Sequence, residues 1–87
     1  MEIKKYYVTQ KELGNALKDI VDEYLKDKLI EVELEKIILK IINLNKSTYY
    51  SKGKVVEKIK RLLGKRRLMI IERIIVNYKG GEMDGNN

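Results

Sequence analysis

A run of cationic side chains between Lys46 and Arg67 is the part of the sequence best suited to chemistry. Six Lys and three Arg lie in this range, and Glu57 is its only acid. Charge of this density repels itself unless an anion neutralises it, and nucleic acid is the commonest anion that does so along an extended surface. The alternative is a solvated face that keeps the protein in solution. The run therefore indicates a nucleic-acid-binding surface, with that alternative left open.

Lys and Arg are expected to make different contacts with nucleic acid. Lys is a flexible point charge suited to phosphate, whereas Arg makes bidentate contacts with guanine or enters a narrow minor groove. A helical rotation of 100° per residue also predicts a stripe of four cations, spaced three and four residues apart from Lys54 to Lys65. The predicted phosphate contacts are Lys52, Lys54, Lys58 and Lys65, and the predicted groove contacts are Arg61, Arg66, Arg67 and Arg73.

The adjacent tyrosines Tyr49 and Tyr50 lie beside these cations. They suit stacking on bases or donation to phosphate. A buried pair in the core or in a dimer contact is the favoured alternative.

Several classes of chemistry are excluded by composition. The chain of 87 residues has no Cys, His, Pro or Trp. Soft-metal sites use Cys or His ligands, and most nucleophilic or general-base catalysis depends on one of the two. Ser47 and Ser51 have no identifiable base or oxyanion partner. We therefore expect no enzyme activity and no metal or other cofactor.

The formal charge of +6 is distributed unevenly. Residues 1–45 carry a net charge of −1, and residues 46–87 carry +7. A chain this short buries only a small hydrophobic core, which leaves little stability unless two chains associate. We therefore expect the first half to fold and to form a homodimer. The N-terminus lacks an apolar stretch of signal-peptide length, and no run reaches the roughly 18 residues that span a bilayer. The expected location is the cytoplasm, without membrane attachment.

Two amphipathic helices are predicted in the first half. Thr9 and Glu12 form a capping box in which each side chain accepts from the backbone N–H of the other, and apolar residues then recur at helical spacing to about Lys28. Gly14 within this helix either marks a close approach of another helix or has no structural role. A second helix is predicted over residues 31–44, with acids in its first turns. A short strand is expected at residues 3–8.

The second half is predicted to contain a helix over residues 55–63 that ends at Gly64. Residues 47–53 form a turn-rich centre. Residues 68–78 allow two interpretations, a further helix or a hairpin around Glu72 and Arg73 that forms a basic wing. A Glu-Arg pair makes a poor two-residue turn, which favours the helix.

These elements predict a mainly α fold with four helices, a small helix-turn-helix-like domain over residues 1–79. The alternative is a winged helix-turn-helix with the short N-terminal strand and a C-terminal hairpin. Residues 80–87 contain Gly, Asp and Asn and are expected to form a disordered tail.

Three segments carry a resemblance to known proteins: residues 9–13, residues 19–22 and residues 64–68. Through these segments the chain resembles a family of short proteins of unassigned function from clostridia and related low-GC bacteria. The resemblance covers about residues 5–75. It is also similar to the small winged helix-turn-helix relaxosome accessory protein of clostridial conjugative plasmids. That similarity implies binding near an origin of transfer and contact with other plasmid-processing proteins.

The expected function is therefore selective binding of double-stranded DNA, as a plasmid or mobile-element accessory factor or as a small transcriptional regulator. The alternative is a protein-interaction adaptor or an RNA-binding module that uses the same basic half. RNA readers usually display aromatic side chains among their cations. With only one tyrosine pair available, DNA is favoured over RNA.

Overall fold

The computed structural model describes the backbone of residues 4–85 and the side chains of residues 4–78. Within that range the chain is mainly helical, with four helices and one two-stranded antiparallel sheet. The order is α1 (Gln10–Leu25), α2 (Glu31–Leu44), α3 (Lys46–Tyr49), β1 (Tyr50–Ser51), β2 (Lys54–Val55) and α4 (Glu57–Gly85).

Helix α4 is interrupted at Gly64, where φ is 79° and ψ is 166°. Helical residues have negative φ, so the chain changes direction at this glycine. We call residues 57–63 the proximal segment and residues 65–85 the distal segment of α4. The sequence prediction of a break at Gly64 is confirmed, and so is the prediction that residues 68–78 are helical.

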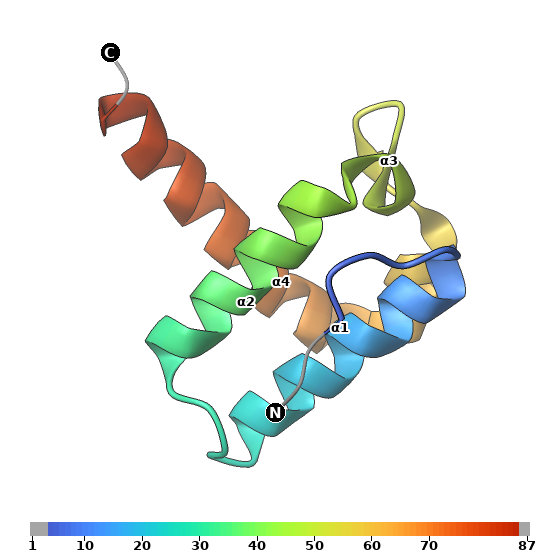
Figure 1. Cartoon of the computed structure of the whole chain (residues 1–87), viewed down its shortest axis with the longest axis horizontal. Helices are drawn as coiled ribbons and strands as arrows, with labels where there is room; N and C mark the ends of the chain where they lie inside the picture. Colours follow the sequence, from blue (N-terminus) through green and yellow to red (C-terminus); the bar gives the residue numbers. More distant parts are fainter. Residues whose placement is uncertain (1–3, 86–87) are drawn as a thin grey trace.

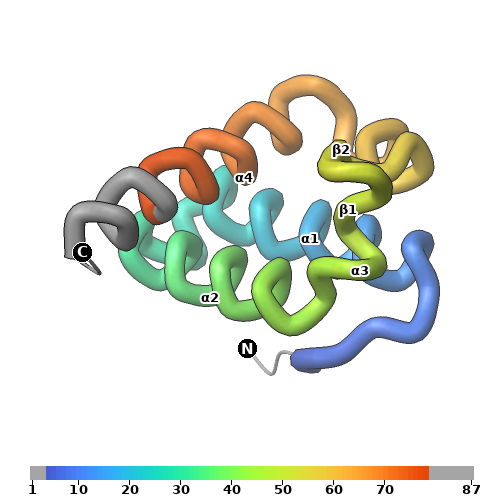
Figure 2. Tube along the Cα trace, turned by 90° about the horizontal axis from the view of Figure 1, so that it is seen from above, coloured from blue at the N-terminus to red at the C-terminus, as the bar shows by residue number. Residues whose placement is uncertain are grey.

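The helices are arranged in two layers. Helices α1 and α2 lie side by side, and α4 packs across one side of the pair while the N-terminal segment passes along the other (Figure 1, Figure 2). Apolar side chains from all of these helices fill the space between the layers. The fully buried ones include Leu13, Leu17, Val21, Ile38, Tyr49, Ile59, Leu63 and Ile71.

Helix α1 approaches α4 closely at Gly14. A Cβ atom at this position would lie 2.7 Å from Cδ1 of Leu62 and 3.6 Å from Cγ1 of Ile59. The absence of a side chain therefore allows the proximal segment to pack directly on the α1 backbone. Of the two alternatives for Gly14, the close helix approach is confirmed.

Helix α1 begins at the predicted Thr9 cap, but the Glu12 side chain accepts from a different backbone N–H than predicted. The backbone N–H of Glu12 donates to Oγ1 of Thr9 at 3.1 Å, while the Glu12 carboxylate accepts from the N–H of Val8 rather than Thr9. Asp27, with φ of 63°, turns the chain after α1, which ends three residues earlier than predicted. Helix α2 has the bounds that the sequence predicted.

The short N-terminal strand is not formed among residues 4–8. Asn45, only 5% exposed, holds this segment instead: Oδ1 accepts from the N–H of Tyr7 at 3.1 Å, and Nδ2 donates to the carbonyl of Lys5 at 2.8 Å. A side-chain amide takes the place of a partner strand. The prediction for Ile3 lies outside the described residues.

The winged helix-turn-helix is not confirmed. Residues around Glu72 and Arg73 are helical, so the C-terminal hairpin is wrong, and the observed sheet lies between α3 and α4. Helix α3 is a single turn, and Gly64 is a one-residue break rather than the usual three- or four-residue turn. The expected disordered tail at residues 80–87 is not tested and stays a prediction; α4 is described to Gly85, and residues 86 and 87 lie outside the described residues.

Candidate nucleic-acid interface

The two-stranded hairpin presents lysines at one end of the molecule. Tyr50 pairs with Val55 and Ser51 with Lys54, which leaves Lys52 and Gly53 as a two-residue turn. Their φ angles are 53° and 79°, the positive pair of a type I′ turn. Both lysines of the hairpin, at positions 52 and 54, are exposed.

The base of the hairpin is anchored in the core. Tyr49, immediately before β1, is 0% exposed, and its hydroxyl donates to Oε2 of Glu72 on the distal segment of α4 at 2.9 Å. Burial and the negative charge of Glu72 raise the pKa of the Tyr49 hydroxyl, which stays a neutral donor. The rings of Tyr50 and Tyr49 pack edge to face, with their centroids 4.8 Å apart. Tyr49 is therefore a core residue, and the core alternative is confirmed for it.

The proximal segment of α4 follows the hairpin directly. It buries Ile59 and Leu63, while Lys58 and Arg61 lie on its exposed side. Glu57 forms an ion pair with Lys60 at 3.4 Å. The single acid of the basic run is thus next to a lysine that the sequence analysis did not select.

Hairpin and proximal segment lie at the same end of the molecule (Figure 1, Figure 2). Together they carry five exposed cations. Lys60 pairs with Glu57, and no ion pair involving the other four is present within residues 4–78. A concentration of unpaired positive charge is the electrostatic feature that binds polyanions. We call these residues the hairpin patch: Lys52, Lys54, Lys58 and Arg61.

The continuous helical stripe from Lys54 to Lys65 is wrong. Lys54 belongs to strand β2, and Lys65 follows the break at Gly64. Only Lys58 and Arg61 share one uninterrupted helical segment. The helix begins at Glu57, two residues after the predicted start, and its backbone leaves the helical conformation at Gly64, so Lys54 and Lys65 lie outside the proximal segment.

Arg67 is engaged within the fold. Its Nε donates to Oδ1 of Asp22 at 2.7 Å, Nη2 donates to Oδ2 at 3.2 Å, and Nη1 donates to the carbonyl of Leu63 at 3.0 Å. The guanidinium holds the pKa of the Asp22 carboxyl below its usual value. Because its guanidinium already makes three hydrogen bonds within the fold, we leave Arg67 out of the interface.

Arg66 and Arg73 are exposed but lie apart from the hairpin. They line one shallow cavity together with Tyr24 and Leu25 at the C-terminal end of α1. The proximal segment instead packs near Gly14, close to the other end of α1. The eight predicted contacts are thus divided between two regions, with Lys65 at the junction after Gly64.

Comparison with known proteins gives one match. A family model described as conserved hypothetical protein matches residues 4–76. The chain belongs to this family. No curated protein and no solved structure matches the chain. Residues 4–76 of this chain, the region that the family model matches, include the hairpin patch and the Asp22–Arg67 pair.

Sequence reasoning missed the hairpin itself. Gly53 was the available signal, because glycine is common in two-residue turns, but the flanking strands are only two residues long and carry no alternating pattern. No helix in residues 4–85 has the length and apolar character needed to cross a membrane.

Proposed function

We propose that the protein binds double-stranded DNA through the hairpin patch. The observation that supports this proposal is the exposure of four cations on two adjoining elements, none of which forms an ion pair among the described residues. A two-stranded ribbon and a helix are both elements that fit a DNA groove. In this arrangement the hairpin acts as a wing that precedes α4.

The roles within the patch follow from side-chain chemistry. Lys52 and Lys54 at the hairpin, and Lys58 on the proximal segment, neutralise phosphates. Arg61 is the patch residue able to form a bidentate contact with guanine. Lys65 extends the phosphate track past the break in α4. Affinity then depends mainly on salt, and sequence preference depends mainly on Arg61.

DNA is a better partner than RNA for this surface. Sequence-specific RNA readers stack unpaired bases on exposed aromatic rings. Tyr49 is buried and Tyr50 is half-buried against it, so neither ring is freely displayed. An RNA-binding or adaptor role remains the alternative outcome of the test below.

The finer form of the proposal is a plasmid or mobile-element accessory factor acting at a transfer origin, or a small transcriptional regulator. It acts in the cytoplasm as a homodimer with no cofactor and no catalytic step, in contact with other plasmid-processing proteins. Two copies of the patch would then contact two half-sites. The DNA sequence that is bound distinguishes transfer from transcription.

The test is fluorescence anisotropy of a labelled duplex of about 30 base pairs, titrated at several salt concentrations. Four lysine–phosphate contacts give a log–log salt slope near about −4. Lys54→Gln and Lys58→Gln are expected to reduce the slope by about 1 each. Lys36→Gln removes an equally exposed lysine from α2 and serves as the matched control.

A flat salt slope, or the same loss with Lys36→Gln as with Lys54→Gln, would overturn the proposal. Random, AT-rich and transfer-origin duplexes are compared with and without Arg61→Ala. Loss on one sequence alone supports readout by Arg61, and equal loss on all of them assigns Arg61 to phosphate. Tighter binding of single-stranded RNA than of any duplex would favour the RNA alternative.

A further inference from the structure

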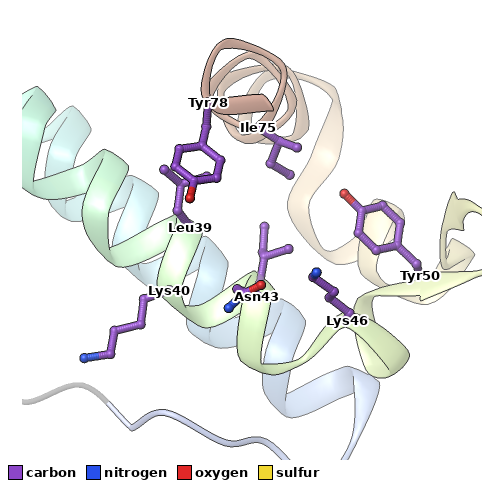
Figure 3. Close-up of a pocket in the computed structure, with 8 residues that line it drawn as sticks. Leu39, Lys40, Asn43, Lys46, Tyr50, Ile75 and Tyr78 are labelled. Atoms are coloured by element: carbon purple, nitrogen blue, oxygen red, sulfur yellow. The ribbon is translucent and has the colours of Figure 1, made fainter. Parts of the chain in front are cut away.

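A cavity of about 560 Å³ lies beside the base of the hairpin, and none of the patch residues lines it. It is formed where the C-terminal half of α2, α3, β1 and the distal segment of α4 meet (Figure 3). Its volume falls within the range of roughly 300–1,000 Å³ that is typical of small-molecule sites. The lining residues are Leu39, Lys40, Ile42, Asn43, Lys46, Tyr50, Ile75 and Tyr78.

The cavity combines an apolar wall with polar groups that point inward. Leu39, Ile42 and Ile75 supply the apolar wall. In Figure 3 the ammonium of Lys46 and the hydroxyl of Tyr50 both face the open space. A few polar groups converging on an apolar surface is the usual construction of a ligand site.

The polar groups favour an anion. Lys46 carries a positive charge, and the Tyr50 hydroxyl and the Asn43 amide are further donors. No Asp or Glu is among the lining residues. Burial and the nearby Glu72 raise the pKa of Tyr50, so its hydroxyl keeps its proton at neutral pH. A carboxylate placed here would meet one charged donor and neutral donors. Glu72, which accepts from the Tyr49 hydroxyl, lies near Tyr50 but does not line the cavity.

From this arrangement we infer that the cavity is a binding site for a small aromatic or branched aliphatic carboxylate. The carboxylate accepts from Lys46 and Tyr50, and the apolar body packs on Leu39, Ile42 and Ile75. The inference is independent of DNA binding, because none of these residues belongs to the hairpin patch.

The neighbouring lysine provides an internal control. Lys40 also lines the cavity, but its side chain extends away from the open space in Figure 3. Lys40 on α2 and Lys46 on α3 are both exposed, and their side chains extend in different directions in Figure 3. The same substitution at the two positions therefore removes the same charge and separates a directed contact from a general electrostatic effect.

The probe is 2-naphthoate, and its neutral analogue is 2-naphthamide. Each is titrated into the full chain, free of DNA, while backbone amide shifts of Tyr50 and Ile75 are followed by NMR. We expect saturable binding of 2-naphthoate, at least tenfold tighter than that of 2-naphthamide. Lys46→Gln is expected to weaken 2-naphthoate about tenfold and Tyr50→Phe severalfold, whereas Lys40→Gln changes the affinity less than twofold.

Three results would overturn the inference: no saturable shift with 2-naphthoate, equal affinity for the two probes, or equal losses from Lys40→Gln and Lys46→Gln. An unchanged amide spectrum of each free variant outside the substituted site shows that it is folded. Failure of this titration leaves the DNA titration unaffected, and the reverse also holds, so the two proposals fail separately.

Discussion

The guanidinium of Arg67 donates hydrogen bonds to both carboxylate oxygens of Asp22. The shorter bond joins Nε to Oδ1 at 2.7 Å. The two residues are 45 positions apart, and both side chains are about 30% exposed. The pair joins α1 to the distal segment of α4 just after the break at Gly64. It thus helps to fix the direction in which α4 continues.

This ion pair predicts a pH dependence of stability. A carboxyl whose folded-state pKa is lowered, as that of Asp22 is, contributes stability above its unfolded pKa of about 4 and loses it as the pH falls through the folded value. Asp22→Asn should lower the free energy of unfolding at pH 7 by about 0.5–1 kcal/mol. Urea denaturation at pH 7, 5 and 3 should show this difference narrowing below about pH 4. An equal difference at all three values would contradict the assignment.

Asn45 is expected to control the order of the N-terminal segment. Besides the two bonds to that segment, its Nδ2 donates to the carbonyl of Ile41 at 2.7 Å. Asn45→Ala removes all three bonds and should cost about 2 kcal/mol. In hydrogen exchange, the Tyr7 amide should lose protection while amides of α2 keep theirs. Retained protection at Tyr7 would show that the segment is held by other contacts.

Gly64 is expected to resist substitution because of its backbone angles. Apart from the adjacent backbone, no atom lies within 4 Å of a Cβ built at this position, so Gly64→Ala causes no clash with other parts of the fold. The φ of 79° with ψ of 166° is nearly exclusive to glycine, and the substitution should cost about 1–3 kcal/mol. Thermal unfolding measures the loss, and Lys65→Ala, one residue further on, should change stability by less than about 0.5 kcal/mol. Equal effects of the two substitutions would contradict the strain argument.

Lys52 should show opposite effects on stability and on DNA binding. Its φ of 53° is unfavourable for lysine but well tolerated by asparagine, the preferred residue at this position of a type I′ turn. Lys52→Asn should raise the free energy of unfolding by up to about 1 kcal/mol and weaken DNA binding by one phosphate contact. Lys54→Gln removes the same charge from β2 without the gain in stability. Unchanged DNA affinity in Lys52→Asn would remove the hairpin from the proposed interface.

Much of the helical framework was predictable from local pattern. The cap at Thr9, the bounds of α2 and the break at Gly64 depend on residues within a few positions of one another. The helix over residues 68–78 was favoured because Glu72 and Arg73 make a poor turn. The N-terminal strand failed because the pattern at residues 3–8 could not reveal that Asn45, far along the chain, would supply its hydrogen bonds.

The candidate site was predictable in composition and not in geometry. The position of the cations, the missing residue types and the apolar faces of α1 and α2 could be read from the sequence, since these properties reside in single residues and their spacing. The pairing of Arg67 with Asp22, the place of Lys54 on a hairpin, and the shared cavity of Lys46 and Tyr50 could be seen only in the folded chain. Those relationships depend on contacts between residues far apart in the chain, and packing across such distances leaves no local signal.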